Sequence, residues 1–391
     1  MIRRTGPLDC KPVHTPAARG PGGKGRDVAR NRNGPADGGG PEGQACYVWP
    51  RGPGGCLKTV NLALQGGGAH GAFTWGVLDR LLEDGRLAVD GISATSAGAI
   101  NAALMAQGLA SGGPEAAREQ LERFWRRISE AGTAALPLMQ WLQNFAWGWN
   151  RDWSPEHLVF DLASRVWSPY QFNPLGLNPL RDLLNETIDI GRIHACDSVK
   201  LFVSATNVET GKIRVFDHRE VTVDAILASA CLPQLFQAVE IDGEHYWDGG
   251  YMGNPALFPL IYQCDCRDIV IIRINPIVRR GVPRTARDIV NRLNEITFNS
   301  SLMRELRAIA FVTRLIDEGK IKDNSMKRML IHMIEADGRM AEFGVASKMN
   351  PDWRFLTHLR DLGREAASSW IDGTLARLGV ESTVDIRAEF L

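Results

Sequence analysis

The sequence predicts an α/β fold with a mainly parallel central sheet, because two strand-like runs each end in a glycine-rich turn that leads into a helix. The first turn, Gly-Gly-Gly-Ala-His-Gly at 66–71, follows the apolar run 59–65. The second, Ala-Thr-Ser-Ala-Gly at 94–98, precedes a helix-like run of small residues. Strand–helix–strand–helix alternation at this spacing is typical of a parallel sheet covered by helices.

The remaining elements have recognisable boundaries. Apolar residues recur at helical spacing in 72–84, and Pro114 suits the first position of a third helix. Asp242-Gly243 between two short runs is a strong signal for a two-residue hairpin turn. We expect strands at 59–65, 89–95, 200–204, 212–216, 238–241, 244–247 and 269–274, and later helices at 222–230, 287–318, 327–335 and 353–378.

Three segments of different composition follow one another along the chain. Residues 1–56 contain 13 Gly and 8 Pro, too many for a packed core, and lack the apolar stretch of a signal peptide, so we expect a disordered tail. Residues 57–284 are expected to form the α/β domain, with a Trp-rich insertion at about 131–180. Residues 285–391 are expected to be a helical C-terminal extension packed on that domain.

Charge and cysteine content narrow the class of protein. The formal net charge is zero, which argues against nucleic acid as the main partner. Seven scattered cysteines without a secretion signal indicate a reducing compartment, so we expect a cytoplasmic protein. Cys264 and Cys266 form the only close pair, and nothing nearby completes a zinc site. We expect neither a metal nor a transmembrane span.

The Trp-rich insertion has two interpretations. Five of the eleven tryptophans fall within 141–167, and a helical projection of 136–149 separates polar from apolar side chains. A helix packed on the core explains this pattern. A lid or membrane-interface helix explains it equally, because tryptophan prefers the boundary between apolar and polar surroundings. The second interpretation predicts peripheral membrane contact through residues 131–170.

The first glycine turn also satisfies the dinucleotide fingerprint Gly-x-Gly-x-x-Gly, with Asp90 in the place of the ribose-binding acid. In such a site the acid closes the second strand. Here the strand continues beyond Asp90 through 92–95, which puts Asp90 near its start. The second glycine turn has no role in nucleotide binding, so we set that interpretation aside.

The two turns instead suggest half of an acyl-transfer site. Ser96 lies between small residues at a strand-to-helix turn, which is how an α/β fold exposes a nucleophilic hydroxyl. The glycine run at 66–68 can direct backbone N–H groups at an oxyanion. A serine needs a base. Asp248, which follows an aromatic strand and precedes Gly249 and Gly250, has a better setting than any of the eight histidines.

These residues resemble the motifs of the patatin-like phospholipase family. The turn at 66–71 resembles the family's oxyanion motif, 94–98 its Gly-x-Ser-x-Gly elbow, and 248–250 its Asp-Gly-Gly motif. Segments 204–208 and 228–233 also look like family segments. The resemblance runs from about Val60 to Pro276. It implies a patatin-like three-layer α/β fold and a Ser–Asp dyad without histidine that hydrolyses acyl esters of lipids.

The resemblance assigns the site residue by residue. Ser96 would be the nucleophile and Asp248 its base, with an oxyanion hole formed by Gly66, Gly67 and Gly68. The residues expected to support these motifs are Ala94, Ala97, Gly98, His70, Gly71, Gly249 and Gly250. Ala94 stands where the family has glycine, and His70 where it commonly has Arg or Lys. A protonated His70 would restore that positive charge.

The resemblance implies a lipid ester as substrate and no cofactor. Two alternatives stay open: a non-catalytic lipid-binding or scaffold protein with the same fold, and an esterase for storage polyester or small esters.

Overall fold

The computed structural model describes residues 47, 49, 57–133, 167–321 and 325–390. The chain divides into two units, 1–43 and 44–391, and every described residue belongs to the second. The predicted disordered tail, apart from residues 47 and 49, lies outside the described residues. So does most of the Trp-rich insertion, including the expected helix at 136–149.

An eight-stranded sheet forms the centre of the described part of the chain, with strand order β5-β6-β3-β2-β1-β7-β8 and β4 beside β3. The strands are β1 Lys58–Leu64, β2 Leu87–Ala94, β3 Lys200–Asn207, β4 Ile213–Phe216, β5 Val239–Ile241, β6 Glu244–Asp248, β7 Asp268–Ile272 and β8 Leu330–Ile334. The neighbouring strands β3, β2, β1, β7 and β8 pair in parallel. The pairs β3–β4, β3–β6 and β5–β6 are antiparallel. The sheet is therefore mainly parallel, as predicted.

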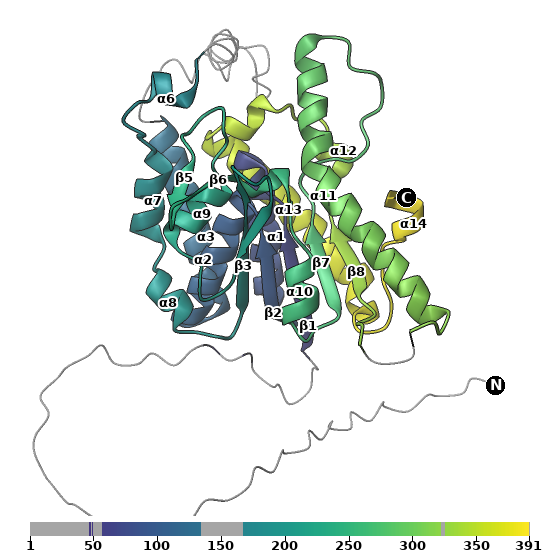
Figure 1. Cartoon of the computed structure of the whole chain (residues 1–391). Coiled ribbons are helices and arrows are strands. Elements are labelled where there is room, and N and C mark those ends of the chain that lie inside the picture. The colour runs from purple at the N-terminus through teal and green to yellow at the C-terminus, as the bar shows by residue number, and fades with distance from the viewer. Residues whose placement is uncertain (1–46, 48, 50–56, 134–166, 322–324, 391) are drawn as a thin grey trace, which may run out of the picture. The chain divides into compact units, whose positions relative to one another are not determined.

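Helices cover both faces of the sheet (Figure 1). The helices are α1 Gly71–Asp84, α2 Ala97–Gly112, α3 Pro114–Thr133, α6 Pro169–Phe172, α7 Pro179–Thr187, α8 Ile190–His194, α9 Val223–Ser229, α10 Phe258–Gln263, α11 Ala286–Asp317, α12 Asp337–Met340, α13 Trp353–Thr374 and α14 Ile386–Phe390. Short 3₁₀ helices are η1 Gly68–His70, η2 Gly249–Tyr251, η3 Ala346–Met349 and η4 Leu375–Arg377.

The apolar residues of the central strands alternate between two cores. In β1, Leu62 and Leu64 belong to the core under α1, α2, α3, α9 and α13, whereas Ala63 belongs to the core under α10 and α11. In β7, Ile272 faces the first core and Ile271 the second. Parallel strands buried on both faces read as continuous apolar runs, which explains why the sequence identified them.

Residues beyond 285 contribute to the sheet as well as to its cover. The expected helix at 327–335 is wrong, because Leu330–Ile334 forms strand β8 in parallel with β7. A short, mostly apolar run of five residues with His332 at its centre is compatible with either element, and the pairing with β7 makes it a strand. The expected hairpin is confirmed: Asp242 and Gly243 have φ of 53° and 80°, as its turn requires.

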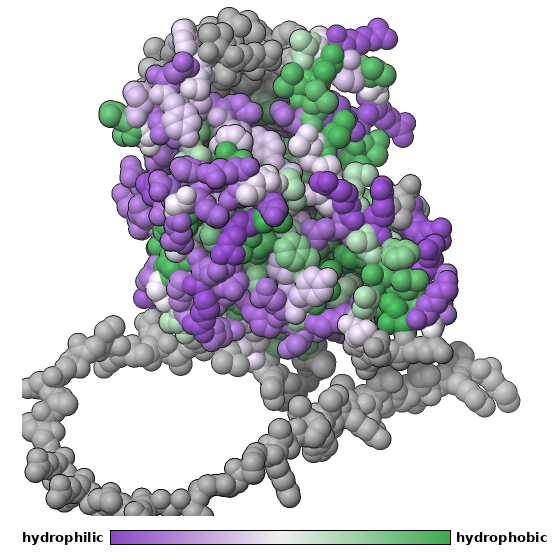
Figure 2. Space-filling view, viewed as in Figure 1, coloured by the Kyte–Doolittle hydropathy of each residue, from purple (hydrophilic) through white to green (hydrophobic). Residues whose placement is uncertain are grey.

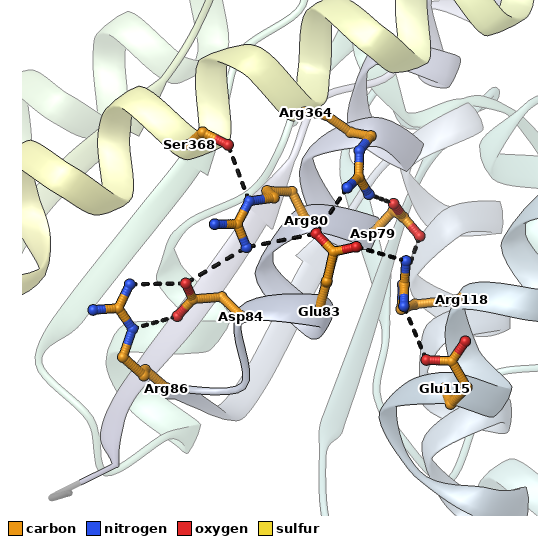
Figure 3. A network of polar contacts seen from close by, with 9 residues as sticks. All are labelled: Asp79, Arg80, Glu83, Asp84, Arg86, Glu115, Arg118, Arg364 and Ser368. Atoms are coloured by element: carbon orange, nitrogen blue, oxygen red, sulfur yellow. Dashed lines mark hydrogen bonds and ion pairs between the residues drawn. The ribbon is translucent and has the colours of Figure 1, made fainter.

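Helix α13 is held against α1 by close backbone contact and by charge. A Cβ at Gly76 would lie 1.9 Å from the Arg360 carbonyl oxygen, and one at Gly363 would lie 2.1 Å from that of Phe73. Figure 3 shows the polar network beside this contact. Arg364 of α13 pairs with Asp79 of α1, which also accepts a 2.8 Å hydrogen bond from Arg118 of α3.

Candidate active site

Ser96 lies in a strained turn between β2 and α2. Its φ is 56° and its ψ is −128°, a conformation that costs a non-glycine residue about 1–3 kcal/mol and occurs mainly at functional sites. The Ser96 N–H donates a 2.8 Å hydrogen bond to Ser229 Oγ, which holds the turn. The close approach of the helix to β1 requires Gly98, since a Cβ there would lie 2.6 Å from the Leu64 carbonyl oxygen.

Ala94 occupies the last position of β2 without exposed surface. It pairs with Leu64 of β1 and Val203 of β3. Its φ is not positive, so the position does not require glycine. The Ala94 methyl group is buried in the core, two residues before the strained Ser96.

The glycine loop after β1 passes close to both Ser96 and the C-terminal region. A Cβ at Gly66 would lie 2.6 Å from the Cβ of Ser96, and a Cβ at Gly68 would lie 2.4 Å from the carbonyl oxygen of Lys348. Gly68 also has a φ of 58°. At Gly71, a Cβ would lie 2.7 Å from that of Ala97, so the starts of α1 and α2 meet closely.

The N–H groups around this loop differ in availability. The Gly66 N–H donates a 2.7 Å hydrogen bond to Asn254 Oδ1, so it is not free to bind an oxyanion. Within the described part of the chain, the N–H groups of Gly67, Gly68 and Ala97 have no hydrogen-bond partner. The expected oxyanion donor Gly66 therefore has a different role: it fixes the loop through Asn254.

Asp248 ends β6 and is 1% exposed. Its Oδ1 accepts a 2.7 Å hydrogen bond from the Gly250 N–H. Burial raises the pKa of Asp248 to about 7, against the lowering effects of the Gly250 N–H, the Ser96 side chain and the charge of Lys348. Gly249 permits the close approach to β3, because a Cβ there would lie 2.1 Å from the Ser204 carbonyl oxygen.

His70 does not supply a positive charge to this site. It is 3% exposed, and its Nε2 bonds Ser347 Oγ at 2.7 Å. Burial, assisted by Lys348 and Arg279, holds the pKa of His70 well below its usual range. This lowered pKa argues against a protonated His70 in place of the family's basic residue. The ring is neutral and packs against Phe343 and Phe355.

Lys348 of η3 is a site residue that the sequence did not indicate. It lines the same pocket as Ser96 and Asp248, and its Nζ donates a 2.7 Å hydrogen bond to Asn275 Oδ1. Burial lowers the pKa of Lys348 to about 8. Nothing in the local sequence around 348 identifies it, since its place depends on the packing of η3 against the glycine loop.

A pocket of about 720 Å³ joins these groups, and apolar side chains dominate its lining. Ser96, Asp248, Lys348 and the glycine loop 66–68 line it, as do the polar side chains of Gln234, Asn294 and Asn350. The apolar lining includes Ile100, Phe124, Ile128, Leu180, Leu232, Leu235, Phe236, Val290, Phe298 and Val345. Such a pocket suits an apolar chain attached to a polar reacting group.

Asp90 and the cysteine pair lie elsewhere. Asp90 Oδ2 accepts hydrogen bonds from the N–H groups of Asp265 and Cys266, at 2.7 and 2.9 Å, so it fixes a turn rather than a nucleotide. No group of three or more potential metal ligands occurs among the residues that the structure describes. No helix in those same ranges is long and apolar enough to cross a membrane.

Comparison with protein families decides the assignment. The model of patatin-like phospholipases matches residues 62–261, which contain both glycine turns and Asp248. The chain belongs to the patatin-like phospholipase family. Membership of this family supports lipid acyl hydrolysis at family level. No curated protein matches the chain.

The solved structures that are similar to this patatin-like protein include VipD and ExoU. VipD from Legionella pneumophila matches with 15% identity and a TM-score of 0.32, covering 77% of this chain and 66% of VipD. The type III effector ExoU matches with 18% identity and a TM-score of 0.33, covering 81% of this chain and 53% of ExoU. ExoU in complex with SpcU, from Pseudomonas aeruginosa, matches with 18% identity and a TM-score of 0.31, covering 85% of this chain and 65% of that one. The chain thus spans about half to two thirds of these proteins.

Proposed function

We propose that this protein hydrolyses lipid esters, with Ser96 as nucleophile and Asp248 as its general base. The observation that carries the proposal is the setting of the two residues. Ser96 is held at φ 56°, and it lines the same pocket as the buried carboxyl of Asp248, whose pKa its side chain helps to lower. A serine hydroxyl needs such a base within hydrogen-bond reach to attack an ester carbonyl.

The pKa of Asp248 suits that role. A carboxyl with an ordinary pKa is too weak a base near neutral pH, whereas a general base works best with a pKa close to the working pH. Burial raises the pKa of Asp248 to about 7. Asp248 would take the Ser96 proton during acylation, pass it to the leaving alcohol, and then activate water to release the fatty acid.

Backbone groups would stabilise the charge that develops on the ester oxygen. The N–H groups of Gly67, Gly68 and Ala97 are without partners among the described residues, and these three residues line the pocket together with Ser96. Each donor of this kind contributes about 10²–10³ in rate when it is fixed in a site from which water is excluded. The apolar remainder of the pocket would hold the acyl chain.

Replacement of the two residues tests the proposal. With a long-chain p-nitrophenyl ester and with phospholipid, Ser96→Ala should lose turnover and Asp248→Asn should retain less than about 1%. Ser369→Ala on the exposed face of α13 is the matched control and should retain full activity. An Asp248→Asn variant with most of its activity would exclude the dyad. If the wild type cleaves no lipid ester and Ser96→Ala binds lipid as well as the wild type does, the lipid-binding alternative is favoured.

A further inference from the structure

Two groups of exposed apolar side chains lie on or beside helices that line the pocket. The first, which we call the α11 bank, consists of Ile289, Leu293 and Ile296, exposed by 43%, 56% and 50%. The second, the α6–α7 bank, consists of Phe172, Leu175 and Leu177, of which Leu175 is 81% exposed. Figure 2 shows hydrophobic side chains gathered over the upper part of α11. Large contiguous exposed apolar patches mark sites of protein or membrane interaction.

The α11 bank is continuous with the pocket wall. Val290, Asn294 and Phe298 line the pocket, and the bank residues Ile289, Leu293 and Ile296 alternate with them along the same helix. One face of the N-terminal half of α11 therefore contacts the acyl cavity, while the adjacent face is exposed and apolar.

The α6–α7 bank borders another part of the pocket lining. Leu180 at the start of α7 lines the pocket, as do Leu235 and Phe236. The segment that carries the bank is tied to this wall, because Gln237 Nε2 donates a 2.8 Å hydrogen bond to the Asn173 carbonyl. In Figure 1, α6 and the first half of α11 lie at the same end of the molecule.

Basic residues accompany the α11 bank. The segment 278–296 contains five arginines and two carboxylates. Arg280 and Arg284 are exposed and form no ion pair with any residue that the structure describes. Glu295 is buried and paired with Arg279 and Arg292, which leaves Asp288 as the exposed carboxylate of this segment.

We propose that the α11 bank, the α6–α7 bank and Arg280 with Arg284 dock the protein on the surface of an anionic phospholipid membrane. Apolar side chains beside arginines are the combination that inserts into the headgroup boundary while the cations contact anionic lipids. Both banks adjoin helices that line the pocket, α11 and α7, so this contact brings the pocket wall close to the lipid. The functional sense of orienting the pocket toward the membrane rests on the proposed lipid hydrolysis, whereas the docking itself does not.

Vesicle flotation with the full-length protein tests the docking. Leu293→Glu combined with Ile296→Glu should lower binding to phosphatidylcholine–phosphatidylserine vesicles at least tenfold, because two carboxylates replace inserted apolar groups. Phe311→Glu, also exposed on α11 but in its C-terminal half, is the matched control and should bind like wild type. Arg280→Gln combined with Arg284→Gln should lower binding to these vesicles about tenfold and leave binding to pure phosphatidylcholine unchanged.

Hydrolysis of a soluble short-chain ester separates this proposal from the proposed function. The Leu293→Glu/Ile296→Glu protein should keep the wild-type rate on that ester, since neither residue lines the pocket, and lose at least tenfold on vesicles. Wild-type vesicle binding by the double variant, or an equal loss in Phe311→Glu, would overturn the docking surface. The docking surface would also be overturned if the wild type formed a dimer that Leu293→Glu/Ile296→Glu dissociates. If the wild type hydrolyses no ester but still binds vesicles, and the Leu293→Glu/Ile296→Glu substitutions abolish that binding, the proposed hydrolysis is wrong and the docking surface stands.

Discussion

The carbonyl oxygen of Lys348 lies 2.4 Å from where a Cβ would be at Gly68. This contact joins the C-terminal region to the glycine loop beside Ser96. The Lys348 side chain reinforces it, because its Nζ binds Asn275, whose Nδ2 donates a 3.0 Å hydrogen bond to the Gly66 carbonyl oxygen. The region after 285 therefore shapes the reacting end of the pocket as well as its wall.

Gly68→Ala should lower kcat about 100-fold or more. The new methyl group would force the loop away from Lys348 and move the Gly67 and Gly68 N–H groups from the developing oxyanion. Gly85→Ala is a matched control, because Gly85 has a similarly positive φ of 71° but no atom within 4 Å of the new Cβ. It should lose about 1 kcal/mol of stability and keep its activity. Equal activity of the two variants would contradict this role for the loop.

The pH dependence of kcat/KM should follow the carboxyl of Asp248. The base must be ionised, so kcat/KM should rise as the pH increases through about 7, the pKa of Asp248. Initial rates of hydrolysis of a soluble ester, measured between pH 5 and 9, would give this profile. A profile that is already flat above pH 5 would mean that another group, or an Asp248 with an ordinary pKa, limits the reaction.

The same raised pKa has a cost in stability. Folding raises the pKa of Asp248 from 3.8 to about 7, so stability falls as the pH rises from about 4 to about 7 and stays reduced above that. The cost above pH 7 is on the order of 4 kcal/mol. Asp248→Asn should therefore raise the Tm at pH 8 and leave it nearly unchanged at pH 4. The opposite pattern in calorimetry would show that the carboxylate is stabilised by its surroundings.

Lys348 should set the pH at which kcat/KM falls on the acidic side of the profile. Its charge lowers the pKa of Asp248, and the other charged groups that act on Lys348 are Glu295 and Arg279. Lys348→Met should move that pH upward by roughly half a unit or more, so the rate falls more at pH 6 than at pH 9. Lys348→Arg should restore the wild-type profile. A loss that is equal at every pH would instead assign Lys348 to packing.

The contact between α1 and α13 should be sensitive to a single methyl group. Gly363→Ala should destabilise the protein by about 1–3 kcal/mol, because its Cβ would lie 2.1 Å from the Phe73 carbonyl oxygen. Gly373→Ala, on the same helix with no atom within 4 Å of the new Cβ, should be neutral or stabilising by up to about 1 kcal/mol. Urea denaturation compares the two, and similar stabilities would argue against the close packing.

Local signals predicted the elements around the site well. Thr59–Gln65 and Val89–Thr95 correspond to β1 and β2 within two residues, because continuous apolar runs that end in glycine turns leave little ambiguity. Ser96 and Asp248 line one pocket, and their places depend on strand ends that the sequence marks clearly. Their chemical roles stay a prediction.

What the sequence missed depends on contacts between distant segments. The strand β8 is defined by pairing with β7 rather than by its own composition. Lys348 reaches the pocket because η3 packs on a loop 280 residues earlier in the chain. The Gly66 N–H is occupied by Asn254, which no spacing rule connects to it. Each of these needed the tertiary structure.

Covalent labelling of Ser96 tests the central claim most directly. The full-length protein is incubated with a long-chain alkyl fluorophosphonate, and its intact mass is compared with those of Ser96→Ala and Ser369→Ala. An activated Ser96 predicts one adduct on wild type and Ser369→Ala and none on Ser96→Ala. Folded wild-type protein without an adduct, or an adduct that persists in Ser96→Ala, would contradict the account.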